Sequence, residues 1–394
     1  KVDIAALYQN LGVYAKEASP QANALATQQV LASTTLDVGV LEGKGSNNWV
    51  VPGSNTQSGL PLLANDPHLG LSAPAVWYFA GLHAPAGQFA DGQAHAALDV
   101  VGATLPGLPF VVLGRTNKAA WGFTNTGPDV QDLYLEALDG KDNYRTPMGQ
   151  QAFETRNDVI KVKGQADVSI KVRITRHGPV ISDVQPAYAQ FLNMDKYAIA
   201  LRWTALDVDN QTIVAGMDAN FANSVAELRH AFSKNHSPMQ SAVMADTSGQ
   251  VLFKAVGKVP VRSAAHDLQG MVPAPGWLSQ YDWQSWVPYE QTPEVTQADI
   301  VKRGWHATAN QKIVPPAYAQ FLTHDWTGPE RFDRISQLLS AGSQFDANNM
   351  KTIQADVHSL AADRLLPYMQ SLTSQHAKAT DSVEAPALTY AEET

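Results

Sequence analysis

The sequence has no cysteine among its 394 residues. This absence excludes disulfide bonds, thiolate metal sites and a cysteine nucleophile, and it is typical of periplasmic or secreted proteins that avoid mispairing, which is where we expect this protein. The sequence also lacks an apolar run of about 18 residues, so no membrane-spanning helix is expected. Basic residues are sparse, with 28 Lys and Arg against 37 Asp and Glu. Nucleic acid and anionic membrane surfaces are therefore not expected as partners.

Several catalytic signatures are missing as well. The chain carries no H-E-x-x-H zinc motif, no phosphate-binding loop and no carboxylate pair typical of a retaining glycosidase. No G-x-S-x-G elbow surrounds Ser46. These absences argue against the commonest metalloprotease, nucleotide-binding and α/β-hydrolase chemistries.

The composition is that of a globular protein, with 44% hydrophobic and 16% charged residues, enough for one large domain or two ordinary ones. Residues 158–174 alternate between apolar and polar side chains, which predicts an antiparallel strand pair with one solvated face. Other short strands are predicted at 49–51, 60–64, 76–82, 110–113 and 118–121. Helices are predicted at 3–18, 224–232, 331–339 and 348–360. The predicted strands follow one another along the chain and the predicted helices lie in separate segments, which favours an α+β fold.

The junction between Gly45 and Ser46 divides two kinds of sequence. Residues 19–45 are rich in Ala, Thr, Ser and Gln and are typical of a spacer, whereas apolar strand segments begin after Ser46. By itself, the junction is compatible with an ordinary turn before a strand. If the bond were cut, however, Ser46 would carry an α-amino group with a pKa of about 7.7–8.0, which could act as the base for its own hydroxyl.

Several motifs in chain order resemble the penicillin acylase family of N-terminal nucleophile hydrolases. The resemblance covers about residues 40 to 370, and its segments are Ser46–Val51, Leu63–Leu69, Gly102–Pro109, Ala120–Thr126, His177–Val180 and Ala309–Asn310. It implies a four-layer αββα sandwich.

The resemblance also implies a division of the chain. Residues 1–18 would be the end of an α-chain, residues 19–45 an excisable linker, and residues 46–394 the catalytic β-chain. We expect the sequence to be a fragment of a longer precursor at both ends, with its own α-chain as the partner of the β-chain.

Five residues are expected in the active site from this resemblance. Ser46 would be the nucleophile and its own amine the base. His68 would orient that amine, since the cephalosporin acylase branch has His where the penicillin G branch has Gln. Asn310 and the backbone N–H of Gly127 would hold the oxyanion, with Asn125 as the alternative to Gly127. Arg331 would organise Asn310 and keep the Ser46 amine neutral.

The turn that follows Gly127 resembles the calcium loop of penicillin G acylase. The matching ligands would be the carboxylates of Asp129 and Asp132 and the backbone carbonyl of Gln131. Calcium takes 6–8 oxygen ligands, so these three alone do not complete a shell, and the family's further ligand comes from the α-chain. The resemblance implies no cofactor in catalysis and, at most, a structural calcium ion.

The expected activity is hydrolysis of a linear amide in a small N-acyl substrate, as in penicillin amidase. An N-acyl-homoserine lactone acylase would use the same residues, and a non-catalytic fragment is the alternative from another class. Residues 74–80, which are mostly apolar, are expected to form the wall that receives the acyl group.

Overall fold

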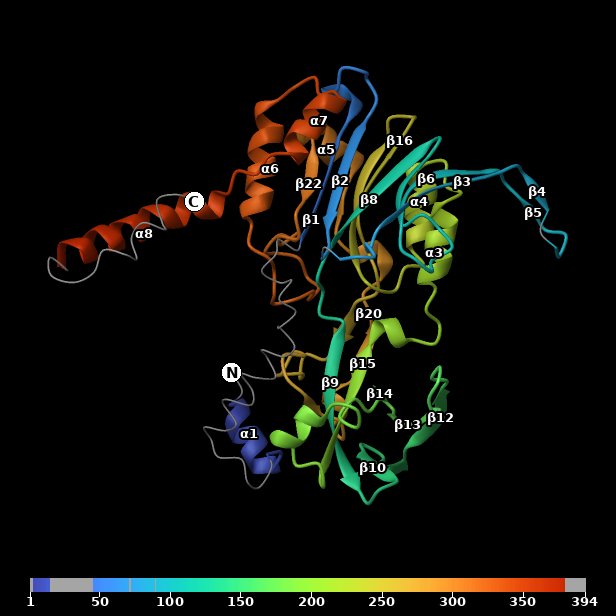
Figure 1. The fold of residues 1–394 in the computed structure, drawn as a ribbon, viewed down its shortest axis with the longest axis vertical. Coiled ribbons are helices and arrows are strands. Elements are labelled where there is room, and N and C mark those ends of the chain that lie inside the picture. The colour runs from blue at the N-terminus through green and yellow to red at the C-terminus, as the bar shows by residue number, and fades with distance from the viewer. Residues whose placement is uncertain (1–2, 15–44, 71, 89, 380–394) are drawn as a thin grey trace.

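The structure is a computed structural model that describes residues 3–14, 45–70, 72–88 and 90–379. The predicted linker, residues 19–45, lies outside the described residues except for Gly45. Figure 1 shows an upper part that contains most helices and a lower part built mainly from strands.

The upper part is built on an antiparallel seven-stranded sheet. Strands β16 and β17 of this sheet are almost entirely buried, because the sheet is covered on both faces. In spatial order its strands are β21 (Glu294–Val295), β17 (Val251–Val256), β16 (Gln240–Asp246), β8 (Ala119–Asn125), β7 (Leu113–Thr116), β6 (Leu98–Thr104) and β3 (Tyr78–Ala84). A small hairpin, β4 (Gly87–Gln88) with β5 (Ala94–His95), projects beyond β3 (Figure 1).

A second, three-stranded sheet packs on one face of the first. Its order is β2 (Leu62–His68), β1 (Gly45–Val51) and β22 (His306–Thr308), all antiparallel. Strands β1 and β2 contact β8 and β16 of the larger sheet. Asn48 of β1 ties the two sheets together, since its side-chain amide donates to the carbonyls of Ser241 at 2.8 Å and Gly122 at 3.3 Å in the large sheet. Its oxygen accepts from the Thr308 hydroxyl at 2.6 Å within the small sheet.

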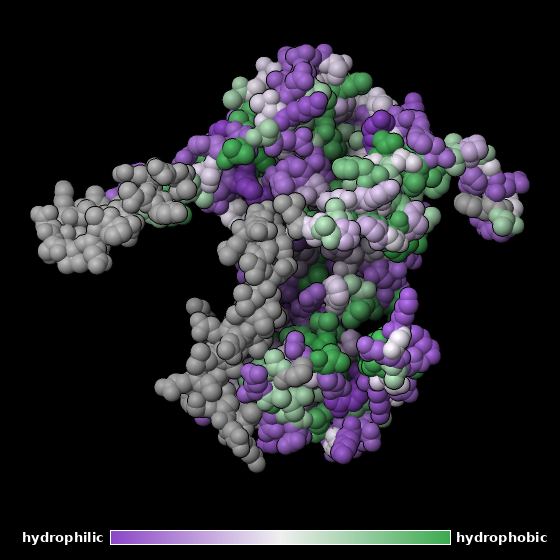
Figure 2. Space-filling model, viewed as in Figure 1, coloured by the Kyte–Doolittle hydropathy of each residue, from purple (hydrophilic) through white to green (hydrophobic). Residues whose placement is uncertain are grey.

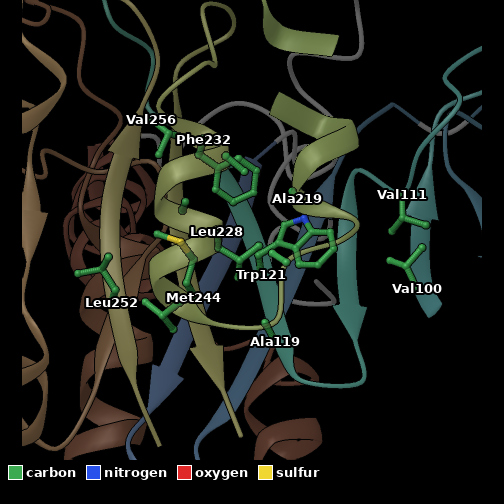
Figure 3. Close-up of a cluster of buried hydrophobic side chains, with 14 residues drawn as sticks. Val100, Val111, Ala119, Trp121, Ala219, Leu228, Phe232, Met244, Leu252 and Val256 are labelled. Atoms are coloured by element: carbon green, nitrogen blue, oxygen red, sulfur yellow. The ribbon is translucent and has the colours of Figure 1, made fainter. Parts of the chain in front are cut away.

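Helices cover the outer faces of both sheets. Helix α4 packs on β8, β16 and β17, with Leu228 and Phe232 against Trp121 and Met244 of the sheet (Figure 3). On the other side, α6 contacts β22 and α7 contacts β2. The helices of this part are α3 (Thr212–Ala219), α4 (Val225–Phe232), α5 (Gln297–Arg303), α6 (Glu330–Ala341) and α7 (Ala347–Gln354).

The lower part centres on β9, which continues the chain from β8. Its main sheet is β11 (Gly149–Ala152), β10 (Asn143–Thr146), β9 (Gln131–Asp139) and β15 (Tyr197–Trp203), with β19 (Ala274–Pro275) beside β9. Beside it lie the sheet of β12 (Glu154–Ile160), β13 (Val168–Thr175) and β14 (Gly178–Pro179) and the helix α1 (Ile4–Leu11). Strand β20 (Trp283–Trp286) lies between the two parts (Figure 1), and it pairs antiparallel with β18 (Pro260–Arg262).

Helix α8 (Leu360–Ala379) extends away from the body. None of the helices in the described ranges is long and apolar enough to cross a membrane. On the face shown in Figure 2, hydrophilic residues dominate the upper part, and hydrophobic residues gather around the hollow between the two parts.

Many of the expected elements are present. The strand pair expected at 158–174 is β12 with β13, and the helix expected at 224–232 is α4, whose first turn is capped by the Ser224 hydroxyl. The mixture of strands and helices confirms the α+β class. The helix at 3–18 ends at Leu11, because Gly12 adopts φ 65° and caps it.

His68 is the last residue of β2, because β2 is an edge strand and can continue through Pro67. Two expectations were wrong. Residues 110–112 form a loop that precedes β7. The helix expected at 348–360 is two elements, since α7 ends at Gln354 and α8 begins at Leu360.

The bridge between the two sheets yields a stability prediction. Asn48→Ala should lower the free energy of unfolding by about 1–3 kcal/mol, because it removes the donor to the Ser241 carbonyl and the acceptor for the Thr308 hydroxyl in a fully buried site. Denaturant unfolding of the complete protein measures this. Asn157→Ala, on the exposed face of β12, is the control and should change little. Equal losses in both variants would contradict the role given to Asn48.

Candidate active site

Ser46 is the second residue of β1, the central strand of the small sheet. Its neighbour Gly45 pairs with His68 and Ser46 pairs with Pro67, so the strand is held in register up to its first residue. The residue is only 7% exposed. The Gly45–Ser46 junction is therefore an ordered strand start and not a free turn.

Arg331, in the first turn of α6, holds the start of β1 through its guanidinium. Nη1 donates to the backbone carbonyl of Ser46 at 3.0 Å and to Oδ1 of Asn47 at 2.8 Å. Nη2 donates to Oδ1 of Asn310 at 2.9 Å. Burial lowers the pKa of Arg331 while the Asp66 carboxylate opposes this shift, and the group stays a cation at neutral pH.

Asn310 follows β22 and adopts a left-handed backbone conformation with φ 67°. Its Oδ1 accepts from the backbone N–H of Ser46 at 2.8 Å as well as from Arg331. Its Nδ2 donates to the carbonyl of Asn125 at 2.8 Å. These three bonds fix which end of the amide is oxygen, and one of the two N–H donors on Nδ2 is left for another acceptor.

The turn after β8 carries the other predicted oxyanion donor. Gly127 adopts φ 66°, which favours glycine, and its N–H donates to Oδ1 of Asn125 at a long 3.3 Å. Asn125 therefore contacts both predicted donors, Asn310 through its backbone carbonyl and Gly127 through its side chain.

His68 is connected to Arg331 through two polar side chains. Its imidazole is 47% exposed, with Nε2 at 3.3 Å from Oδ2 of Asp66. The same Asp66 oxygen accepts from Nδ2 of Asn47 at 2.9 Å, and Asn47 accepts from Arg331. Burial raises the pKa of Asp66, and the hydrogen bond from Asn47 opposes that shift.

Two cavities meet at Ser46. A polar one of about 390 Å³ is lined by all five predicted active-site residues, Ser46, His68, Gly127, Asn310 and Arg331. An apolar one of about 470 Å³ extends from Ser46 toward α3 and α4. Among the side chains that line the apolar cavity are Trp77, Leu105, Leu108, Phe110, Val111, Leu113, Trp121, Phe123, Ala215 and Phe232.

The prediction that residues 74–80 form the wall that receives the acyl group is largely wrong. Trp77 alone of these residues lines the apolar cavity beside Ser46. Phe79, on the edge strand β3, is 82% exposed and does not line that cavity. The cavity is built instead from β7, β8, the loop 105–112 and helix α3, and sequence reasoning missed these because no local pattern marks them.

The predicted calcium ligands lie outside both cavities, and their arrangement does not fit a metal ion. Both carboxylate oxygens of Asp132 are engaged by Arg262, at 2.9 Å to Nε and 2.6 Å to Nη2. Trp283 Nε1 donates to the same carboxylate at 2.6 Å. Burial raises the pKa of Asp129 to about 6, whereas Arg262 lowers it. Gln131 is exposed in β9, opposite Trp203.

His177, part of a motif that carried the resemblance, lies apart from Ser46 in the lower part. Its imidazole bridges Glu136 at 2.7 Å and Asp282 at 3.0 Å and stacks on Tyr134. Arg176 forms a forked pair with the same Asp282. This cluster joins β9 to the residues that precede β20.

Comparisons with known proteins agree with this architecture. A model of the penicillin amidase family matches residues 2–390. The chain is 31% identical over 352 residues to the acyl-homoserine lactone acylase QuiP of Pseudomonas aeruginosa, and 32% identical over 339 residues to penicillin acylase 2 proenzyme of a Pseudomonas species. These alignments cover 86% and 84% of this chain but 38% and 40% of the relatives.

A solved structure is also similar. Thermostable penicillin G acylase from Alcaligenes faecalis matches with a TM-score of 0.67 and 25% identity, over 84% of this chain and 56% of that chain. The present chain thus spans about two fifths of the length of the curated relatives it matches. With a family model that matches nearly its whole length, the chain belongs to the penicillin amidase family.

Proposed function

We propose that the complete protein hydrolyses a linear amide in a small N-acyl compound and releases an apolar acyl group. The observation that carries this proposal is the position of Ser46, which lines both an apolar and a polar cavity. An acyl chain in the first and an amine portion in the second would place the scissile carbonyl beside the Ser46 hydroxyl.

Maturation would begin at the Gly45–Ser46 bond. Ser46 Oγ attacks the Gly45 carbonyl, the C–N bond breaks, an ester forms, and the proton from Oγ passes to the Ser46 nitrogen. Water then hydrolyses the ester and leaves a free hydroxyl and amine on Ser46. The close approach of Arg331 supports a glycine at position 45, because a Cβ there would lie 2.8 Å from Nη2.

In the catalytic cycle, the Ser46 amine would take the proton from Oγ, directly or through one water. Oγ attacks the substrate carbonyl, the protonated Ser46 amine passes its proton to the substrate nitrogen as the C–N bond breaks, and the amine product leaves. Water then hydrolyses the acyl ester and frees Oγ. The bond from the Ser46 nitrogen to Asn310 Oδ1 uses one N–H, so the lone pair of a free amine stays available to accept a proton. The nearby Arg331 cation favours the neutral amine.

The oxyanion would be held by the second N–H of Asn310 Nδ2 and by the Gly127 N–H. Asn310 is suited to this task because Arg331 and Ser46 fix its oxygen and Asn125 fixes its nitrogen. The Gly127 N–H would exchange its long bond to Asn125 for the shorter bond to an oxyanion.

The remaining expectations are proposals about the whole protein. The two stacked sheets with helices on both outer faces would be the αββα sandwich of N-terminal nucleophile hydrolases. An α-chain from the same precursor would complete the site, and the protein would act in the periplasm or outside the cell. A catalytically silent fragment is the alternative, and the first prediction below separates the two.

The first prediction concerns maturation. The complete protein should be cleaved before Ser46, and Ser46→Ala should abolish both cleavage and amide hydrolysis because it removes the attacking oxygen. Intact-mass spectrometry reads out the chain lengths. Ser54→Ala, an exposed serine shortly after β1, is the control and should mature normally. An active chain that is not cleaved would refute the mechanism.

The second prediction concerns Asn310. Asn310→Ala should lower kcat by about 10²–10³-fold, the scale measured when one oxyanion donor is removed. Steady-state kinetics on matured protein test this, with Asn117→Ala, an exposed asparagine, as the control. A change below about fivefold would move the oxyanion role to another group.

The third prediction concerns the acyl group. At Gly216 of α3, an added Cβ would lie 2.3 Å from the ring of Phe110, so Gly216→Ala should push this ring into the apolar cavity. The variant should lose activity on long acyl chains by roughly 10-fold or more per rejected methylene while activity on the shortest chain stays nearly unchanged.

Mass spectrometry of the products tests this, with acyl-homoserine lactones of several lengths and a phenylacetyl penicillin as substrates. The released acid should appear together with an intact lactone or β-lactam ring. A ring-opened product that keeps its side chain would overturn the amidase proposal. Turnover of only one substrate class would decide between acyl-homoserine lactone acylase and penicillin acylase activity.

A further inference from the structure

Arg262 lies where the resemblance to penicillin G acylase placed a calcium ion. Its side chain is 3% exposed and that of Asp132 is 2% exposed, and the two form a forked ion pair. Nη2 also donates to the backbone carbonyl of Asp129 at 3.1 Å and lies 3.5 Å from the carboxylate of Asp129. One guanidinium therefore contacts three oxygen groups of the segment 129–132.

Two aromatic rings and the backbone of Gly270 lie near the guanidinium. The rings of Trp283 and Phe321 lie 5.9 Å and 5.8 Å from its Cζ atom. The backbone of Gly270 closes another side, since a Cβ there would lie 2.5 Å from Asp132 Oδ1 and 3.0 Å from Arg262 Nη2. Gly270 has φ 77°, so both its conformation and its lack of a side chain suit this contact.

This cluster adjoins the turn that carries a predicted oxyanion donor. Asp129 is two residues after Gly127, and its N–H donates to the carbonyl of Leu322 at 2.7 Å. Its carbonyl is bound by Arg262, so the peptide groups on both sides of Asp129 are fixed. Arg262 reaches this turn from β18, which pairs with β20 between the upper and lower parts (Figure 1).

We propose that the Arg262 guanidinium supplies, in this chain, the positive charge and the contacts that a structural metal ion would otherwise supply. It neutralises Asp132, joins β18 to β9, and positions the turn that presents the Gly127 N–H to Ser46. The last part of this inference rests on the proposed amidase function, whereas the first two parts do not. Arg262 is thus a positioning residue, and calcium is not needed for stability.

The distinction from a metal site follows from the chemistry of the donors. A calcium ion would need the Asp132 oxygens and the Asp129 carbonyl, and Arg262 already donates to each of them. A guanidinium and Ca²⁺ would also repel each other at this distance. Occupation of the same oxygens by both cations is therefore excluded by geometry and charge.

The test compares melting temperatures of the complete, matured protein with a chelator and with calcium chloride. The wild-type melting temperature should be the same in both. Arg262→Gln should melt roughly 5–10 °C lower with chelator, because it leaves Asp132 buried without its counter-charge. Calcium chloride should recover part of this loss, and it should recover none in Arg262→Gln/Asp132→Asn.

Arg173→Gln is the matched control. Arg173 also forms a forked pair, with Asp183 at 2.8 and 2.6 Å, but it lies in β13, away from both cavities. This control should show no recovery with calcium chloride and an unchanged kcat.

Kinetics separate positioning from stability. At a temperature where all variants are folded, Arg262→Gln should lower kcat at least tenfold with little change in KM, since a displaced Gly127 N–H weakens transition-state binding. Arg262→Lys keeps the charge but loses the bidentate geometry of the guanidinium. Compared with Arg262→Gln, it should recover the melting temperature more than it recovers kcat.

Three results would overturn the inference. A wild-type melting temperature that falls with chelator and returns with calcium would show that a metal does this work. Failure of calcium chloride to stabilise Arg262→Gln would show that the acidic groups are not a cation site. An unchanged kcat in Arg262→Gln would remove the positioning role. Absence of amide hydrolysis in the wild type would instead refute the proposed function and leave the melting comparison decisive.

Discussion

The arrangement around Ser46 depends on the guanidinium of Arg331. It binds the Ser46 carbonyl, the Asn47 side chain and the Asn310 side chain at once, and so it joins the start of β1, the loop after β22 and the first turn of α6. An ammonium group could not replace this planar guanidinium without loss of some of these hydrogen bonds. Gly45 lies against the same group, where a side chain would have no room. One buried cation thus sets both the geometry of Ser46 and the residue allowed before it.

The layers of the fold explain why two different cavities meet at this point. The small sheet packs on the large one, and the Asn48 side chain joins the two by hydrogen bonds to β8 and β16. The large sheet and α3 supply apolar side chains on one side of Ser46. The loops after β2, β8 and β22 supply polar groups on the other. A serine at the edge between these environments is suited to a substrate with an apolar acyl part and a polar amine part.

How much the sequence predicts depends on whether the signal is local. The helix at 224–232 and the strand pair at 158–174 depend on neighbours in the chain, and both predictions were confirmed. The five predicted active-site residues come from distant segments, and only the family resemblance grouped them before they were seen to line one cavity. The contact between Asp132 and Arg262 spans 130 residues, and the sequence gives no sign of it. The edge position of β2, which lets Pro67 lie in a strand, is likewise a property of the assembled sheet.

We propose that a free Ser46 amine, kept neutral beside Arg331, is the catalytic base. The pH dependence of kcat/KM for the matured protein between about pH 5 and 9 tests this role. We expect kcat/KM to rise through one apparent pKa below about 7.7, because a nearby cation lowers the pKa of an α-amino group. Arg331→Lys should keep this pKa and lose kcat, whereas Arg331→Gln should raise it. A rate that does not change with pH, or an apparent pKa that is the same in all three proteins, would contradict the account.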